Sequence, residues 1–179
     1  MPRPKLTKHR FRIAAVAALA MTSAAGWAAS RNAPPLVMLN DSASEPTGFY
    51  VRTSQAPEVG ALVAFRTPPQ AFPYADRRHS LLRRHPILKA VAATAGDRVC
   101  TQSNRLTIND RIRAPIAAKD RFGDVLPRWR DCRQLTAGEL FVFSDLIPNS
   151  FDSRYFGPVN RNDVLGVYRL ILPIRLGQS

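Results

Sequence analysis

The sequence ILKAVAATAGD, residues 87–97, decides the fold that we expect for this chain. Its first seven residues are apolar except for Lys89, which is typical of a buried β-strand, and the segment 95–97 is typical of a turn. A lysine inside such a run either extends its amine to water from an edge strand or is buried. Burial would disfavour the charged form and lower the pKa of the amine, which could then take a proton from a serine hydroxyl. Both interpretations are open at this point.

Short runs of the same kind lie on both sides of this stretch. Further strands are predicted at 48–53, 60–65, 98–101, 105–108, 140–143 and 164–174, with a turn at Asn109-Asp110 and a short helix around 74–84. Residues 112–137 are predicted to be irregular, and residues 145–158 to form a long polar loop. Fifteen prolines and nine glycines argue against a helix bundle. The pattern therefore predicts a mainly-β domain, a sandwich or a barrel, with short helices.

The N-terminus has the composition of an export segment. Five basic residues precede an uncharged, alanine-rich run at 13–29. Basic residues stay on the cytoplasmic side of a membrane, while an apolar run inserts. This run is short for a spanning helix and long for a signal-peptide core, so a retained anchor and a signal peptide cleaved near Gly26 and Ala28 are both open. We therefore expect a signal peptide or membrane anchor at 1–29 and one domain at 30–179.

The charge and the cysteines limit the partners and the compartment. The formal net charge is +13; five of the 26 basic residues and none of the 13 acidic ones lie in 1–29, so the domain keeps +8. The domain's charge is not gathered in one tract, and nucleic acid is not expected as a partner. After export, Cys100 and Cys132 are expected to form a disulfide that adds about 3 kcal/mol of stability. No CxxC spacing or histidine cluster accompanies them, so we expect no metal and no cofactor.

Two further segments carry reactive side chains. Residues 40–50 place Ser44 in a loop of small residues before a predicted strand, and Pro46 stiffens the backbone there. The alternative interpretation is a serine-rich loop without reactivity. Residues 148–158 gather Asn, Ser, Asp and Arg side chains after the strand at 140–143. Such a segment forms either a rigid, internally hydrogen-bonded loop or a solvated polar one.

In this order, and after an export segment, the three segments resemble the boxes of the signal-peptidase family of serine–lysine peptidases. Ser-x-Pro at 44–46 resembles the nucleophile box, and Leu-Lys-x-Val-x-Ala-x-x-Gly-Asp at 88–97 resembles the general-base box. Asn-Ser-x-Asp-Ser-Arg-Tyr-Phe-Gly at 149–157 resembles the C-terminal box. The opening Asn-x-Ser-x-Ser-x-Pro-x-Gly-x-Tyr at 40–50 is similar to the branch of TraF-type conjugal-transfer peptidases. The resemblance covers residues 36–172.

The resemblance implies a signal-peptidase-like fold and a set of site residues. Ser44 is the expected nucleophile, Lys89 the expected base and Asp152 the expected supporting carboxylate. The oxyanion hole and the support of the site are assigned to Ser42, Ser153 and Arg154. Because a carboxylate that touched Lys89 would raise the pKa of the amine, we expect Asp152 to orient its neighbours or the lysine loop instead.

The resemblance also implies a function. We expect a serine peptidase on the periplasmic side of the inner membrane that trims a membrane-inserted pilin precursor and joins its ends through an acyl-Ser44 intermediate. Other proteins of the transfer apparatus are expected partners. The sequence departs from leader peptidases where Ala95 replaces a proline and where 144–146 reads Ser-Asp-Leu instead of Gly-Asp-Asn. These departures indicate a dedicated substrate.

Two alternatives remain open at the level of sequence. The first is a general leader peptidase that hydrolyses many exported proteins. The second is an exported basic β-domain without enzyme activity that binds anionic lipid or DNA. Its binding patch would be Arg77, Arg78, Arg83 and Arg84.

Overall fold

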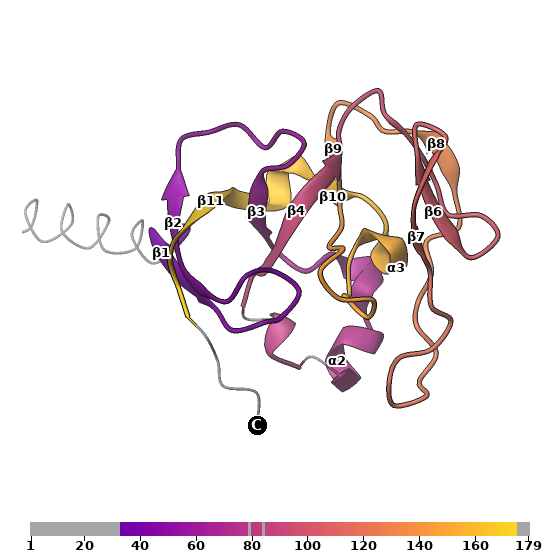
Figure 1. Ribbon diagram of the computed structural model, residues 1–179, viewed down its shortest axis with the longest axis horizontal. Coiled ribbons are helices and arrows are strands. Elements are labelled where there is room, and N and C mark those ends of the chain that lie inside the picture. Colours follow the sequence, from indigo (N-terminus) through magenta and orange to yellow (C-terminus); the bar gives the residue numbers. More distant parts are fainter. Residues whose placement is uncertain (1–32, 79, 84, 175–179) are drawn as a thin grey trace, which may run out of the picture. The chain divides into compact units, whose positions relative to one another are not determined.

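Two antiparallel sheets make up most of the structure, a computed structural model that describes residues 33–78, 80–83 and 85–174 (Figure 1). The seven-stranded sheet has the order β1-β2-β11-β3-β4-β9-β10. Its strands are β1 (Val37–Asn40), β2 (Gly48–Thr53), β3 (Leu62–Phe65), β4 (Ile87–Ala93), β9 (Glu139–Val142), β10 (Val159–Asn160) and β11 (Val164–Pro173). The four-stranded sheet has the order β7-β6-β5-β8. Its strands are β5 (Arg98–Cys100), β6 (Arg105–Ile108), β7 (Arg111–Pro115) and β8 (Cys132–Gln134).

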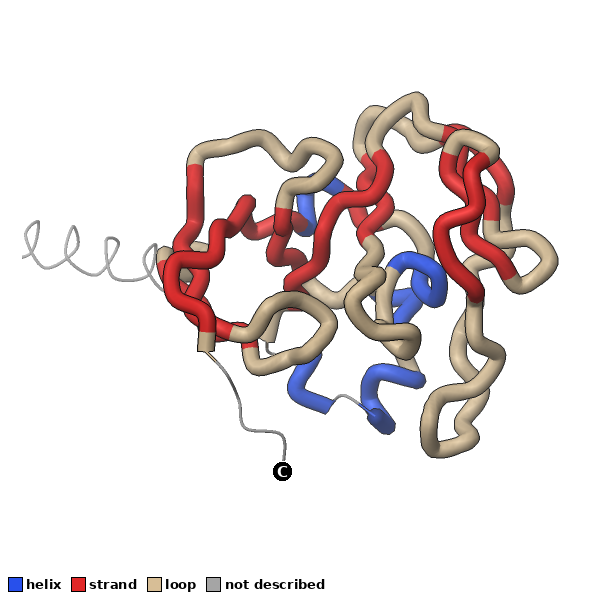
Figure 2. The backbone as a smooth tube through the Cα atoms, viewed as in Figure 1, coloured by secondary structure: helices blue, strands red, loops and turns tan. Residues whose placement is uncertain are grey.

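The described helices are short and lie between strands (Figure 2). They are η1 (Pro69–Ala71), α2 (Tyr74–Arg78), η2 (Ser80–Arg83), α3 (Ser153–Phe156) and η3 (Arg161–Asp163). The prediction of a mainly-β domain with short helices is therefore confirmed. No helix within the described ranges has the length and apolarity needed to cross a bilayer. The predicted export segment at 1–29 lies outside the described residues, as does the boundary that follows it.

Strand β4, which carries Lys89, lies in the interior of the larger sheet. It pairs with β3 on one side, where Lys89 is opposite Val63, and with β9 on the other. Neighbours on both sides explain why the segment is almost continuously apolar, as buried strands are. Lys89 itself is only 5% exposed. The structure thus excludes the edge-strand interpretation of this lysine.

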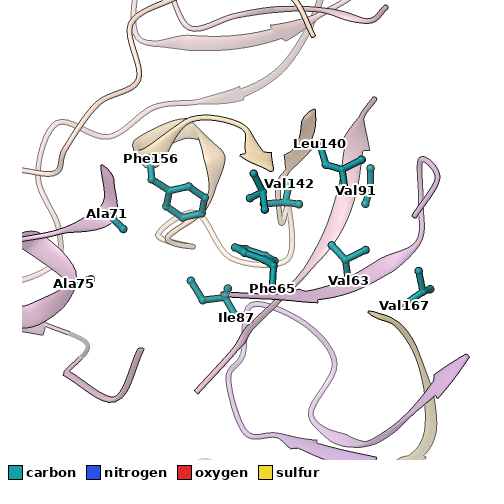
Figure 3. Close-up of a cluster of buried hydrophobic side chains, with 11 residues drawn as sticks. Val63, Phe65, Ala71, Ala75, Ile87, Val91, Leu140, Val142, Phe156 and Val167 are labelled. Atoms are coloured by element: carbon teal, nitrogen blue, oxygen red, sulfur yellow. The ribbon is translucent and has the colours of Figure 1, made fainter. Parts of the chain in front are cut away.

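A cluster of 11 buried apolar side chains packs the larger sheet against the helices (Figure 3). Phe65, Ile87 and Val142 come from three neighbouring strands, and Phe156 comes from α3. A second cluster joins the four-stranded sheet to β9 and α3, through side chains that include Phe141. Because α3 contributes to both clusters, the segment that precedes it is held against the end of β9.

Two predictions about loops were wrong. The segment predicted to be irregular contains β7 and β8, and Asn109-Asp110 forms the tight turn into β7 with φ angles of 50° and 63°. On β7 the sequence Arg-Ile-Arg-Ala alternates between polar and apolar residues over only four positions before Pro115, which is too short a pattern to stand out. The segment predicted as a long polar loop contains α3, whose four residues are all buried. Their burial depends on contacts with distant strands, which local polarity does not indicate.

Cys100 and Cys132 lie directly opposite each other on β5 and β8 and form a disulfide. The bond closes a loop with a sequence separation of 32 residues and ties the short edge strand β8 to its sheet. The predicted disulfide is therefore confirmed.

Replacing both cysteines by serine is expected to lower the free energy of unfolding by about 3 kcal/mol, because the unfolded chain loses its cross-link. Urea unfolding of the two proteins measures the difference. Wild-type protein under reductant is the control and should unfold with the midpoint of the double variant. Equal midpoints for the variant and the oxidised wild type would contradict the stabilising role of the bond.

Candidate active site

The loop between β1 and β2 is organised by one buried side chain, Asn40. Its Nδ2 donates to the carbonyls of Ser42, Glu45 and Pro46, at 3.0, 3.1 and 3.1 Å, and its Oδ1 accepts from the Ser42 N–H at 3.2 Å. These bonds satisfy loop carbonyls that no sheet partner reaches. The loop therefore presents Ser44 from a fixed backbone, and the serine is 4% exposed.

The Ser44 hydroxyl lies between a second serine and a lysine. Its Oγ is 2.9 Å from the Ser42 Oγ, and the Ser44 N–H donates to that same Ser42 oxygen at 3.4 Å. The carbonyl of Ser44 accepts from the hydroxyl of Ser144, which follows β9. Both sides of the Ser44 peptide are thus held by the side chains of other residues, Ser42 and Ser144.

Lys89 reaches Ser44 from the interior of the sheet. Its Nζ lies 2.5 Å from the Ser44 Oγ and donates to the Leu88 carbonyl at 3.1 Å. This distance is within the reach that a general base requires. Burial lowers the pKa of the Lys89 amine, because an ammonium loses its hydration there. The structure therefore brings together the predicted nucleophile and the predicted base, and burial shifts the pKa of the amine in the direction that such a base requires.

Nearby charges act on Lys89 in both directions. Against the effect of burial, the charges of Asp152 and Glu45 raise the pKa of the amine, while that of Arg154 lowers it. Burial acts on Glu45 in the opposite direction and raises the pKa of this carboxyl to about 7, because the carboxylate loses its hydration. The protonation of Lys89 thus depends on which of its neighbours are charged.

Asp152 forms a buried ion pair with Arg154. The carboxylate is 0% exposed and the arginine 1%. Asp152 Oδ1 accepts from Arg154 Nε at 2.8 Å and Oδ2 accepts from an Arg154 terminal nitrogen at 2.9 Å, which is the bidentate geometry of strong pairs. The guanidinium also donates to the carbonyls of Ser150 and Pro115. The pair is therefore well satisfied, and it fixes the turn before α3.

This ion pair is connected to Ser44 through Ser144. The Ser144 N–H donates to Asp152 Oδ2 at 3.4 Å, and the Ser144 hydroxyl donates to the Ser44 carbonyl. Ser153 holds the same region from the other side, because its Oγ accepts from the Val142 N–H at the end of β9. Asp152 thus supports the nucleophile through a backbone contact and acts on Lys89 through its charge.

The structure separates the predicted site residues into two groups. The side chain of Ser44 contacts those of Ser42 and Lys89. Asp152 contacts the backbone of Ser144 and pairs with Arg154, and Ser153 contacts the end of β9. Sequence reasoning did not assign a role to Ser144 or Glu45. The signal for Ser144 was its place at the departure from the Gly-Asp-Asn pattern, and the signal for Glu45 was a carboxylate next to the expected nucleophile.

Comparison with known proteins identifies the class. The profile of signal peptidase, peptidase S26, matches residues 7–173 of this chain. The chain therefore belongs to the signal peptidase family, and membership implies a serine peptidase with a protein substrate.

Two relatives from Escherichia coli, each described as plasmid transfer protein TraF, are similar over most of their length. One is 31% identical, and the match covers 94% of this chain and 96% of the relative. The other is 33% identical, and the match covers 89% of this chain and 92% of the relative. Among solved structures, a signal peptidase I from Enterococcus faecalis is 20% identical with a TM-score of 0.38, covering 64% of this chain and 98% of that one.

Replacing Asp152 by asparagine is expected to lower the free energy of unfolding by about 3–5 kcal/mol, because Arg154 would stay buried without a counter-charge. Asparagine keeps an acceptor for the cap of α3, so the effect reports the lost charge. Urea unfolding measures it. The matched control is Asp110→Asn in the β6–β7 turn, whose side chain is 81% exposed and should change stability little. Similar losses in the two variants would contradict the importance of the buried pair.

Proposed function

We propose that this chain is a serine peptidase of plasmid transfer that trims a pilin precursor and joins its ends, with Ser44 as nucleophile and Lys89 as base. The observation that carries the proposal is the 2.5 Å contact between the buried Lys89 amine and the Ser44 hydroxyl. The two relatives described as plasmid transfer proteins support the link to plasmid transfer. The pilin substrate comes from the resemblance in the nucleophile box.

The first half-reaction forms an ester. The Ser44 oxygen attacks the carbonyl carbon of the peptide bond while Lys89 takes the hydroxyl proton. The resulting oxyanion is stabilised by the Ser44 N–H and the Ser42 hydroxyl, which the substrate oxygen must draw away from their mutual contact. The carbon–nitrogen bond then breaks, and Lys89 gives its proton to the departing amine. The products are an acyl-Ser44 ester and the released C-terminal fragment.

The second half-reaction decides between cutting and ring closure. If the N-terminal amine of the bound chain attacks the ester, Lys89 takes a proton from that amine and returns one to the Ser44 oxygen, and a cyclic peptide leaves. If water attacks in the same way, the product is linear. Ring closure therefore requires that the N-terminus be held close to the ester and that water be kept out.

We propose that the reaction takes place in the periplasm, at the inner membrane. The Cys100–Cys132 disulfide supports an oxidising compartment. The basic and then apolar N-terminus supports export and an approach to the membrane. A membrane-inserted precursor would meet the enzyme there, together with other transfer proteins. We propose that the reaction needs no metal and no cofactor.

The main alternative within the family is a general leader peptidase, which would release linear products from many exported proteins. The second alternative, a binding domain with a basic patch, has less support from the described residues. Arg83 pairs with Asp76, and Arg78 pairs with Asp120 and Asp124. These acidic partners reduce the positive charge that the patch would offer, and Arg84 lies outside the described residues.

Co-expression with a conjugative pilin precursor tests the proposal. Wild-type enzyme is expected to give a product one water lighter than the trimmed linear chain, as measured by intact-mass spectrometry. Ser44→Ala and Lys89→Ala should each lower the rate by about 10⁴-fold or more, as for other residues that act as one catalytic unit.

The matched controls are Ser54→Ala and Lys119→Ala, which change exposed residues outside the site and should process like wild type. A linear product from wild type would retain the peptidase and remove the cyclisation. Full processing by Ser44→Ala or Lys89→Ala would contradict the assigned nucleophile or base.

A further inference from the structure

Glu45 is a buried carboxyl group beside the nucleophile that the reaction described above does not use. It follows Ser44 directly and is only 6% exposed. Glutamate is rarely buried to this extent without a partner. Its Oε1 accepts from the backbone N–H of Ala90 at 3.2 Å, and Ala90 follows Lys89 on β4. The side chain therefore spans from the nucleophile loop to the strand that carries the base.

The Ala90 N–H is available because β9 ends at this point. Phe143 donates its N–H to the Ala90 carbonyl at 3.0 Å, and this is one residue beyond the end of β9 at Val142. The chain then continues to Ser144, which contacts the Ser44 carbonyl. Glu45 thus supplies the acceptor that the neighbouring strand no longer provides, and a buried N–H needs one.

Glu45 also lies among charged groups from every element packed around it. Its pKa is raised to about 7, first by burial and further by the charges of Asp145 after β9 and Asp152 before α3. The Ala90 N–H and the charge of Lys89 lower it. On β2, the charge of Glu45 adds to burial in raising the pKa of Tyr50. Lys89 in turn faces Asp152 and Arg154 as well as Glu45.

We propose that Glu45 is a positioning residue for the reaction of Ser44 and Lys89. Its carboxyl fastens the nucleophile loop to the strand of the base, and its charge sets the pH at which the Lys89 amine is free to take a proton. This proposal rests on the proposed function, since it concerns the same serine and lysine.

The physical basis is that each buried group acts on the charge of the other. A negative Glu45 raises the pKa of the Lys89 amine and so favours the ammonium, which cannot accept the Ser44 proton. A neutral Glu45 exerts no such effect, and burial then lowers the pKa of the amine with less opposition. A negative Glu45 therefore favours the inactive form of the lysine, and the sign is clear: removing that charge lowers the pKa of Lys89.

The first test is Glu45→Gln in the full chain in detergent micelles. Glutamine keeps the size and one acceptor oxygen for the Ala90 N–H, and it replaces the charged carboxylate by a neutral amide. The pKa of Lys89 is followed through the ¹³Cε chemical shift, assigned by comparison with Lys89→Arg. It is expected to fall by about one pH unit, at the low end of the effect of a neighbouring charge. The matched control is Glu58→Gln, an exposed carboxyl before β3 whose removal should leave the Lys89 titration unchanged.

The second test separates position from charge by kinetics on the pilin precursor. For Glu45→Gln, the acid limb of the rate profile should move to lower pH by the same amount as the Lys89 titration. For Glu45→Ala, which leaves the Ala90 N–H without its acceptor, kcat should fall by about 10- to 100-fold with KM little changed. Because glutamine restores the acceptor, kcat of Glu45→Gln should be higher than that of Glu45→Ala. A residue that only filled space would not show a recovery that depends on the acceptor.

An unshifted Lys89 titration in Glu45→Gln would overturn the role of the charge. Equal kcat values for Glu45→Ala and wild type would overturn the role of the contact. Thermal unfolding shows that each variant is folded when measured, and the glutamine variant carries the test if the alanine variant is not. The titration of Lys89 needs no substrate. If the wild type failed to process the precursor, the proposed function would be contradicted, but the effect of Glu45 on the pKa of Lys89 could still be measured.

Discussion

The burial of one lysine amine against one serine hydroxyl is the constraint on which the arrangement of this domain depends. An ammonium group inside a sheet loses its hydration, so burial lowers the pKa of the Lys89 amine. Lys89 is only 5% exposed, on a strand that pairs with β3 opposite this residue and with β9 from Val91 onward. The same burial that would make Lys89 costly in an ordinary core gives it the property that a base at neutral pH requires.

The rest of the site holds the serine at the amine without adding a further charge in direct contact with it. Asn40 fixes the loop, Ser144 fixes the Ser44 carbonyl, and the pair of Asp152 and Arg154 fixes the segment that carries Ser144. Both oxygens of Asp152 are engaged by the arginine, yet the charge of Asp152 still raises the pKa of Lys89, and the charge of Glu45 acts in the same direction. Glu45 differs from Asp152 because no arginine partner is among its described contacts. We therefore assign to Glu45 a share in setting the protonation of Lys89.

Much of the fold could be predicted from local patterns, and the strands around Tyr50 and Lys89 are the clearest cases. The disulfide followed from two cysteines and an export segment, and the three boxes predicted a serine and a lysine whose side chains lie 2.5 Å apart in the structure. The burial of α3 was not predictable in this way, because it depends on contacts with distant strands. The strands β7 and β8 are too short, at five and three residues, for their patterns to stand out. The roles of Glu45 and Ser144 were not predicted for a related reason. Their hydrogen-bond partners lie 45 and 100 residues away in the sequence. A side chain whose role comes from such a contact looks like any other polar residue of a loop.

The most direct test of the account replaces the Lys89 amine chemically. The chain has two cysteines, and both are in the disulfide, so Lys89→Cys introduces a thiol that can be alkylated selectively. Aminoethylation of that thiol with 2-bromoethylamine, in denaturant without reductant and followed by refolding, rebuilds a lysine-like amine at position 89. Processing of the pilin precursor is then compared before and after alkylation. The account predicts no processing by the cysteine variant and recovered processing by the aminoethylated protein, whereas processing by the unalkylated variant would contradict the assignment of Lys89 as the base.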